Sequence, residues 1–406
     1  MVKSLFGYAK TTESIAKSGG WNIYDDKFKI ASSDEYGNAL LPVDKFDPNI
    51  SELEIPSPGF PPSHQLIKNA KNLISEYDYF RNYTPKSIWI SGTNGKTTTT
   101  KMTEHLLKDR GAIMGGNVGI PLGELVGKGA KIWILETSSF TMHYTKFATP
   151  DIYALLPISD DHISWHGSAK EYINAKLKPL SMMKEGSVAI IPKEYEKSVK
   201  SYAKIISYDD EIDLANKFSI DIGRIDFRVP FLMDAIMALC IESIIFSRCS
   251  IDLLNKFIIE PHKLEELKDA KGRLWVNDTK ATNIDASLQA LARYEGSKIH
   301  IILGGDDKGV SIEKVVARAA KQGATIYAIG SNCDDIEKMS DKFGAKVFNA
   351  KELYNAVNLI DKEMNIDDVA LLSPACASLD QFSSYAHRGD KFKEFIAKLY
   401  KISNLS

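Results

Sequence analysis

One short segment, Gly92-Thr93-Asn94-Gly95-Lys96-Thr97-Thr98, constrains the fold of this chain more than any other part of its sequence. It follows the apolar run 87–90 and precedes a helical pattern over 97–110. Backbone N–H groups of such a loop and the N-terminus of the next helix bind phosphate oxygens. The lysine adds a positive charge, and the hydroxyl after it suits magnesium. Although Ile90 stands where the common phosphate loop has its first glycine, the segment predicts a strand, a nucleotide loop and a helix.

Short apolar runs alternate with helical patterns over most of the chain. We predict strands at 4–8, 22–24, 132–135, 152–156, 188–191, 274–277, 299–303, 325–329, 346–348 and 370–372. We predict further helices at 12–17, 231–248, 251–259 and 391–400. This alternation is typical of mostly parallel α/β sheets that helices cover on both faces.

The length of 406 residues favours two or three domains, at about 150 residues per domain. We expect a Rossmann-like N-terminal domain over 1–84 and a central P-loop ATPase-type parallel sheet over 85–262. A third alternating segment predicts a C-terminal Rossmann-like domain over 263–406.

Charge and cysteine usage exclude several classes of protein. The 51 Lys and Arg residues nearly balance the 53 Asp and Glu residues, so no general basic field for nucleic acid or an anionic membrane is expected. The N-terminal residues lack the apolar core of a signal peptide, and no apolar run approaches 18 residues. The four cysteines are scattered without metal-binding spacing. We therefore expect a cytoplasmic protein and a monomer.

Four prolines and a glycine fall within residues 55–62. Proline lacks a backbone N–H group, so this stretch excludes a helix and a central strand. It is either a rigid connector or a loop whose backbone contacts a ligand, and the residues alone favour the connector.

Polar side chains follow two strands predicted next to the phosphate loop. Glu136 ends one strand, and Asp160-Asp161-His162 follow the next. The carboxyl ends of parallel strands share one edge of a sheet, so these side chains and the loop should converge there. Glu136 is a hard oxygen ligand for magnesium, whereas His162 is a softer one. Alone, Glu136 could start a helix and His162 could be a surface histidine, but convergence favours a site.

The third alternating segment has polar loops after three of its strands, at 278–283, 304–309 and 373–378. Lysines and hydroxyls at strand ends suit a small anionic substrate. Ordinary turn chemistry explains each loop separately, but the three together favour an anion site.

Two other classes of nucleotide protein fit less well. A P-loop switch or motor would be favoured by a strand ending in aspartate, whereas here Glu136 ends it. A dinucleotide oxidoreductase needs G-x-G-x-x-G after a strand, and we find none.

The phosphate loop 92–97 resembles the ATP loop of the Mur ligases and of their relative folylpolyglutamate synthetase. Segments 277–283, 304–308 and 373–382 are similar to those of the D-glutamate-adding members. This resemblance implies an ATP- and Mg²⁺-dependent ligase for UDP-N-acetylmuramoyl-L-alanine and D-glutamate in peptidoglycan precursor synthesis. The reaction would pass through an acyl phosphate and a tetrahedral intermediate. Folate glutamylation is the closest alternative.

The resemblance also implies roles for individual residues. The ATP residues would be Gly92, Thr93, Asn94, Gly95, Lys96, Thr97, Thr98 and Asp278. One magnesium ion would be bound by Thr97 and Glu136, and a second by His162 and Lys176, with Lys176 carbamylated. Lys96, His162 and Lys176 would thus be the catalytic residues. The UDP-sugar residues would be Thr12, Ser57, Gly59 and Asn117, which reverses the connector interpretation. D-glutamate would be surrounded by Lys280, Thr282, Lys308, Ser378 and Tyr385.

The sequence departs from the family at three places. The usual His-Asn-x-x-Asn motif is missing near 231–239, so no adenine contacts are assigned. Lys263 stands where Arg is common, and Tyr385 where Phe is common. Without the resemblance, Lys176 and Lys178 would both be interpreted as exposed lysines of one helix.

Overall fold

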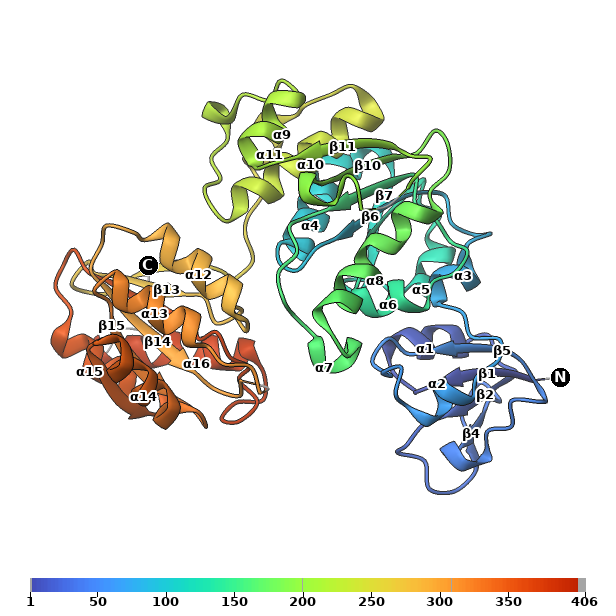
Figure 1. Cartoon of the computed structure of the whole chain (residues 1–406), viewed down its shortest axis with the longest axis horizontal. Coiled ribbons are helices and arrows are strands. Elements are labelled where there is room, and N and C mark those ends of the chain that lie inside the picture. Colours follow the sequence, from blue (N-terminus) through green and yellow to red (C-terminus); the bar gives the residue numbers. More distant parts are fainter. Residues whose placement is uncertain (1, 199, 308, 401–406) are drawn as a thin grey trace. The chain divides into compact units, whose positions relative to one another are not determined.

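A computed structural model describes residues 2–198, 200–307 and 309–400 (Figure 1). Its contacts divide the chain into two compact units, 1–257 and 258–406. The first unit contains two sheets and the second contains one. All three are α/β sheets with mostly parallel strands, which confirms the predicted fold class.

The N-terminal sheet has five strands in the order β3-β4-β2-β1-β5. Its strands are β1 (Val2–Phe6), β2 (Trp21–Tyr24), β3 (Ser32–Ser33), β4 (Ala39–Leu41) and β5 (Ser51–Pro56). Its helices are α1 (Lys10–Ala16), α2 (Gln65–Asn69) and a 3₁₀ turn, Val43–Lys45. The first proline of the stretch 55–62, Pro56, is compatible with β5 because β5 is an edge strand, where a missing N–H group is tolerated. The exclusion of a central strand there is confirmed.

The central sheet is fully parallel, in the order β11-β10-β9-β6-β8-β7. Its strands are β6 (Lys86–Ser91), β7 (Ala112–Gly116), β8 (Ile132–Glu136), β9 (Ile152–Leu155), β10 (Val188–Pro192) and β11 (Lys204–Tyr208). Its helices are α3 (Glu76–Phe80), α4 (Lys96–Leu107), α5 (Leu122–Leu125), α6 (Ser139–Tyr144), α7 (Ile163–His166), α8 (Ala169–Met182), α9 (Glu211–Lys217), α10 (Phe231–Phe246) and α11 (Ile251–Leu254). Four 3₁₀ turns lie at Lys108–Arg110, Val126–Lys128, Lys193–Tyr195 and Ile222–Arg224.

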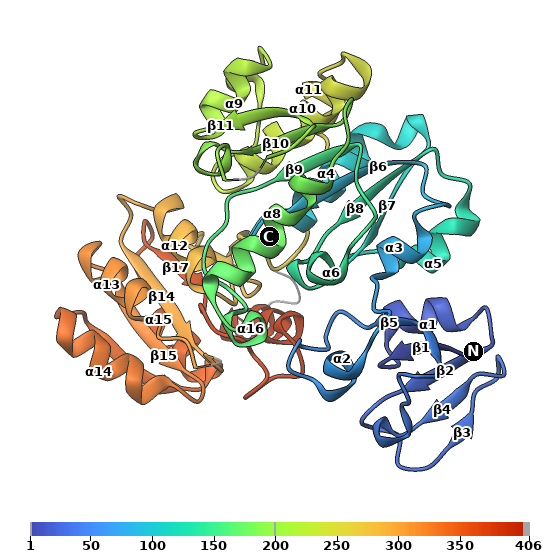
Figure 2. The same ribbon diagram turned by 45° about the vertical axis from the view of Figure 1, so that its right-hand side comes forward.

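Helices α4 and α8 pack against this sheet, and Figure 2 shows them on its two sides. The strands are continuous apolar runs in the sequence because helices cover both faces of the sheet. Helix α10 packs along α4 and is apolar on all sides, as expected for a buried helix. Among the described residues, no helix has the length and apolar character needed to cross a membrane.

Helix α11 ends earlier than predicted, at Leu254 instead of residue 259. The side chain of Asn255 accepts a hydrogen bond from the N–H group of Asp226 at 3.1 Å and donates to the carbonyl of Arg224 at 2.8 Å. These bonds hold Asn255 against the turn at 224–226, so the chain leaves the helix there.

The second unit has a six-stranded sheet in the order β12-β13-β17-β14-β15-β16, parallel except for the pair β12–β13. Its strands are β12 (Glu265–Lys268), β13 (Leu274–Asn277), β14 (Ile299–Gly304), β15 (Thr325–Ile329), β16 (Val347–Lys351) and β17 (Val369–Leu372). Its helices are α12 (Ile284–Arg293), α13 (Glu313–Lys321), α14 (Cys333–Phe343), α15 (Leu353–Glu363) and α16 (Tyr385–Tyr400). Helix α16 begins earlier than predicted, and its first turn contacts the loop after β13, where the Thr279 hydroxyl donates to the Tyr385 carbonyl at 3.0 Å.

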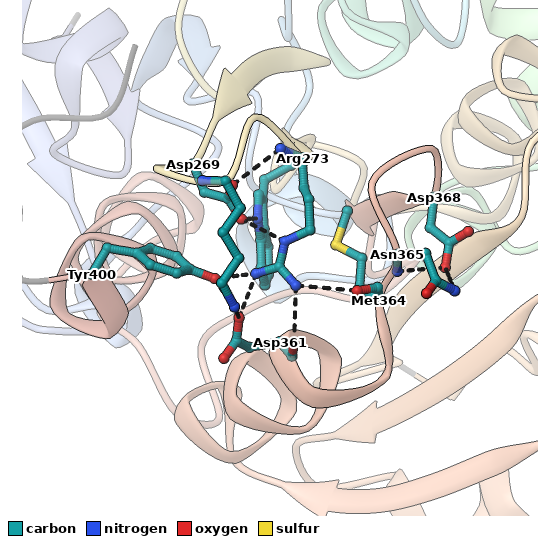
Figure 3. A network of polar contacts seen from close by, with 9 residues as sticks. Asp269, Arg273, Asp361, Met364, Asn365, Asp368 and Tyr400 are labelled. Carbon is teal, nitrogen blue, oxygen red and sulfur yellow. Dashed lines mark hydrogen bonds and ion pairs between the residues drawn. The ribbon is translucent and has the colours of Figure 1, made fainter.

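A buried arginine joins elements at the amino ends of these strands (Figure 3). The guanidinium of Arg273 donates to the Asp269 carboxylate at 2.9 Å and to the carbonyls of Asp361 and Met364 at 3.0 and 3.2 Å. It also contacts the Asp361 carboxylate and the Tyr400 hydroxyl. Burial raises the pKa of both carboxyls, but hydrogen bonds, including those from Arg273, outweigh it and hold each pKa below its ordinary value.

We predict that Arg273→Met destabilises the second unit by about 3 kcal/mol, because the variant leaves the buried Asp269 carboxylate without its cation. Asp361 would keep its ion pair with Lys271 at 3.4 Å. The predicted destabilisation is the lower end of the usual cost of removing one partner of a buried ion pair. The lower end applies because 24% of the Asp361 side chain is exposed. Hydrogen-exchange protection of the β13 and β17 amides should fall accordingly. Lys338→Met, which removes an exposed ion pair with Asp335, should leave protection unchanged. Equal protection in Arg273→Met and the parent would contradict this account.

Candidate active site

The phosphate loop connects β6 to α4 in a conformation that requires two glycines. Gly92 has φ of 139° and Gly95 has φ of 82°, where side chains are strained. A Cβ atom at Gly92 would also lie 2.5 Å from that of Leu156, and one at Gly95 would collide with the carboxylate of Asp234. Leu156 and Asp234 therefore pack closely against the loop and leave no room for a side chain at either glycine.

Lys96, the first residue of α4, folds back over this loop. Its Nζ donates to the carbonyls of Gly92 at 2.9 Å and Thr93 at 2.7 Å. The ammonium therefore lies beside the loop whose N–H groups would bind phosphates, as the sequence predicted.

Glu136 forms hydrogen bonds with two predicted site residues, one assigned to ATP and one to the UDP-sugar. Its Oε2 accepts a hydrogen bond from Thr97 Oγ1 at 2.7 Å, and its Oε1 accepts one from Asn117 Nδ2 at 2.6 Å. The register of β6 against β8 pairs Ile90 with Glu136, so the carboxylate reaches the start of α4. The structure thus brings Thr97, Glu136 and Asn117 together at one strand edge.

Lys176, on α8, is buried, with only 1% of its surface exposed. Its Nζ donates to the Gly92 carbonyl at 2.6 Å and lies 4.8 Å from the centre of the Tyr172 ring. Burial first, and then the positive charge of Lys96, lowers the pKa of Lys176 well below its ordinary value. The interpretation of Lys176 as an exposed lysine was therefore wrong. Lys178 is also not fully exposed, since its Nζ donates to the His143 carbonyl at 2.8 Å.

His162 lies in the loop after β9 with φ of 51°. Its ring keeps 43% exposure, and its Nε2 lies 3.5 Å from Asp161 Oδ2. The ring centre is 6.1 Å from that of Tyr172, the ring that Lys176 also faces. Among the described residues, no three His, Cys, Asp or Glu side chains form a metal cluster. A metal ion at this edge would therefore need hydroxyl, phosphate, water or modified lysine oxygens as further ligands.

The loop with Ser57 and Gly59 contacts helices of the central sheet. Tyr144 Oη donates to the Phe60 carbonyl at 2.5 Å, and Trp165 Nε1 donates to the Gly59 carbonyl at 3.3 Å. The stretch is therefore held at the strand ends of both sheets of this unit. This position is compatible with the ligand-loop interpretation.

Thr12, in the first turn of α1, is fully buried against the loop between β1 and α1. Its hydroxyl donates to the carbonyls of Gly7 at 2.7 Å and Ala9 at 3.0 Å. Its side chain thus shapes this loop, and a contact with the UDP-sugar would have to come from the loop backbone.

In the second unit, backbone hydrogen bonds join two of the predicted anion loops, and a side-chain bond joins the third. Asp306 and Ala377 exchange bonds at 3.0 and 2.9 Å, and Gly304 donates to the Pro374 carbonyl at 2.9 Å. Asp278 is buried, where its carboxylate accepts from Ser373 Oγ at 2.7 Å. Burial raises the pKa of Asp278 to about 7.

Four of the five predicted D-glutamate residues are described, and they lie at the same edge of this sheet. Lys280 Nζ is 5.8 Å from the centre of the Tyr385 ring, which is 39% exposed. Thr282 is half-buried, and its N–H group donates to the Lys280 carbonyl at 2.9 Å. Ser378 is buried on the loop after β17, and Lys308 lies outside the described residues.

The sequence analysis missed three residues of these edges. Asp234 Oδ1, on α10, accepts from Thr99 Oγ1 at 3.0 Å beneath the phosphate loop. Tyr172 bonds Thr93 Oγ1 at 3.0 Å, and Arg388 is buried beside the loops after β13 and β17. No motif marks these positions, and only the missing asparagines near residue 231 drew attention to Asp234.

The chain is similar to known proteins in sequence and in fold. Residues 90–224 match the model of the Mur ligase middle domain. A UDP-N-acetylmuramoylalanine–D-glutamate ligase of Campylobacter jejuni (strain 81-176) is 55% identical over 98% of this chain and 99% of the relative. The protein of that name from Helicobacter pylori (strain ATCC 700392 / 26695) is 43% identical over 97% and 99%.

Solved structures with low sequence identity share the fold. A MurF ligase of Thermotoga maritima in complex with ADP superposes with a TM-score of 0.61 at 16% identity, covering 98% of this chain and 96% of that one. MurC of Thermotoga maritima gives 0.57 at 13% identity, with 99% of each chain covered.

We predict that Lys96→Ala lowers turnover of ATP by at least about 100-fold while the protein stays folded, because a positioned charge at the phosphates is lost. Steady-state rates and circular dichroism measure the two quantities. Lys108→Ala, an exposed lysine just after the same helix, is the control and should keep normal turnover. A folded Lys96→Ala variant with most of its activity would exclude the loop from the mechanism.

Proposed function

The chain belongs to the Mur ligase family, and we propose that it joins D-glutamate to UDP-N-acetylmuramoyl-L-alanine with ATP, in peptidoglycan precursor synthesis. One observation carries the substrate assignment. The match to ligases of that name extends over nearly the whole of both chains at 55% identity. Likeness to a folylpolyglutamate synthase of Mycobacterium tuberculosis is limited to 77% of this chain at 14% identity, so folate glutamylation is disfavoured.

The reaction needs ATP because a carboxylate does not acylate an amine directly. The γ-phosphoryl group of ATP moves to the carboxylate of the L-alanyl group and gives an acyl phosphate and ADP. The amine of D-glutamate attacks the acyl carbon and gives a tetrahedral intermediate. This intermediate expels phosphate, and the amine loses a proton as the amide forms. Phosphoryl transfer depends on positioning and charge stabilisation more than on covalent help from the protein.

The residues of the phosphate loop fit these requirements. Backbone N–H groups of the loop and of the first turn of α4 would hold the phosphates together with the ammonium of Lys96. The N–H group of Thr93 is not among them, because it donates to the Pro157 carbonyl at 3.1 Å. Thr97 and Glu136 fit a magnesium ion, since they place a hydroxyl and a carboxylate oxygen 2.7 Å apart at this edge. Magnesium neutralises the developing charge on the phosphoryl oxygens.

For a second magnesium ion we assign His162 and a carbamylated Lys176. An ammonium is excluded as a ligand, because at about 4 Å and an effective dielectric of 20 it repels a divalent cation by roughly 8 kcal/mol. Carbon dioxide reacts with the neutral amine, and the lowered pKa of buried Lys176 favours this form. The carbamate would give a hard, anionic oxygen ligand.

Other assignments follow the family motifs and the strand edges described above. For the UDP-sugar we assign Thr12, Ser57, Gly59 and Asn117, and for ATP also Asp278. For D-glutamate we assign Lys280, Thr282, Lys308, Ser378 and Tyr385. The three regions 1–84, 85–262 and 263–406 would bind the UDP-sugar, ATP and the amino acid, respectively.

The proposed function is tested by the substrate requirement of ATP turnover. Release of ADP should require UDP-N-acetylmuramoyl-L-alanine and D-glutamate together, and L-glutamate should not replace the D-isomer. Turnover with a folate and L-glutamate instead would favour the alternative ligase. Turnover without any acceptor would favour an ATPase.

We predict that Lys176→Ala is nearly inactive and that acetate partly restores its turnover, because acetate supplies the missing oxygen ligand. Lys170→Ala is the matched control, since Lys170 is an exposed lysine of the same helix. Rates with and without acetate, at constant ionic strength, measure the rescue. Normal turnover of Lys176→Ala, or equal effects of acetate on both variants, would contradict the carbamate.

A further inference from the structure

The second unit contains two buried arginines with different electrostatic surroundings. Arg273 is 4% exposed and is balanced by the carboxylates of Asp269 and Asp361 (Figure 3). Arg388, in the first turn of α16, is 1% exposed. Among the described residues, no carboxylate forms a hydrogen bond or an ion pair with Arg388.

Neutral oxygens take up the hydrogen bonds of Arg388. Nε donates to Thr279 Oγ1 at 2.9 Å, and Nη1 donates to the Ala377 carbonyl at 3.3 Å. Nη2 donates to the carbonyls of Thr279 at 3.0 Å and Cys376 at 3.1 Å. The planar guanidinium therefore joins the loop after β13 to the loop after β17.

A buried cation without a bonded anion is unfavourable, because burial removes its hydration. Burial accordingly lowers the pKa of Arg388 to about 10, and the smaller electrostatic effects of the Cys376 thiol and the Asp380 carboxylate oppose the shift. The Asp380 carboxylate accepts a hydrogen bond from the Ser331 N–H group at 2.9 Å. The positive charge of Arg388 is thus poorly compensated within the described residues.

The position of each arginine explains the contrast. Arg273 precedes β13 and lies at the amino ends of the parallel strands. Arg388 contacts the loops that follow β13 and β17, at the carboxyl ends, where ligands of such sheets bind. The uncompensated charge therefore lies at the ligand edge, between two loops to which the D-glutamate residues Lys280 and Ser378 belong.

We propose that Arg388 is a positioning residue for the amino-acid substrate. It holds loops 278–283 and 373–378 in place, and the carboxylates of bound D-glutamate balance its charge. This inference rests on the proposed function, which supplies the dianionic amino acid. Lysine cannot replace Arg388 fully, because an ammonium has the charge but lacks the planar fork that reaches both loops.

The test compares Michaelis constants for all three substrates in Arg388→Met, Arg388→Lys and the matched control Arg273→Lys. A unit charge at about 8 Å and an effective dielectric of 20 changes affinity by roughly 30-fold. Arg388→Met should raise KM for D-glutamate by about that factor, and Arg388→Lys should raise it less. KM for ATP and for the UDP-sugar should stay within about twofold. Arg273→Lys should lower Tm without changing KM for D-glutamate.

Two results would overturn the inference. One is an unchanged KM for D-glutamate in Arg388→Met, or in Arg388→Lys if the methionine variant does not fold. The other is an equal rise of all three KM values, which a purely structural role would give. Failure of the proposed function is distinguishable, because the parent protein would then not turn over ATP with D-glutamate at all.

Discussion

The parallel pairing of β6 with β8 and β9 is the constraint on which the candidate active site depends. It pairs Ile90 with Glu136 and Ser91 with Leu155, so three strands end at one edge. The hydrogen bond between Thr97 and Glu136 follows from this register. A shift by one residue would turn Glu136 to the other face of the sheet and separate it from the phosphate loop.

Both units place basic side chains at the carboxyl edge of a parallel sheet. In the first unit, Lys96 and Lys176 donate to the same carbonyl, that of Gly92. In the second unit, Arg388 bonds neutral oxygens alone among its described partners. All three proposed substrates are anions, and in the second unit bound D-glutamate would supply the negative charge that Arg388 lacks among its bonded partners. Arg273 shows the contrasting case, since its carboxylate partners lie at the opposite edge and make it a structural residue.

Local signals in the sequence predicted the fold class, the phosphate loop and its closeness to Glu136. These features depend on short apolar runs and turn residues, which are visible within a few positions. The short strands β3 and β4 and the edge strands β5, β7, β11 and β12 were missed, because their apolar patterns are brief. Burial of Lys176 and the contacts of Asp234 and Arg388 depend on residues 84 to 135 positions away, which no local pattern reveals.

The central claim is that ATP activates the carboxylate of the acceptor by phosphorylation. Transfer of ¹⁸O from that carboxylate tests it most directly. With both oxygens of the L-alanyl carboxylate labelled, each phosphate released during ligation should carry one ¹⁸O atom, and the new amide should retain the other. Mass spectrometry of the phosphate and the product measures both. Unlabelled phosphate released in step with product would contradict the acyl phosphate, and with it the account of the site given by Lys96, Thr97 and Glu136.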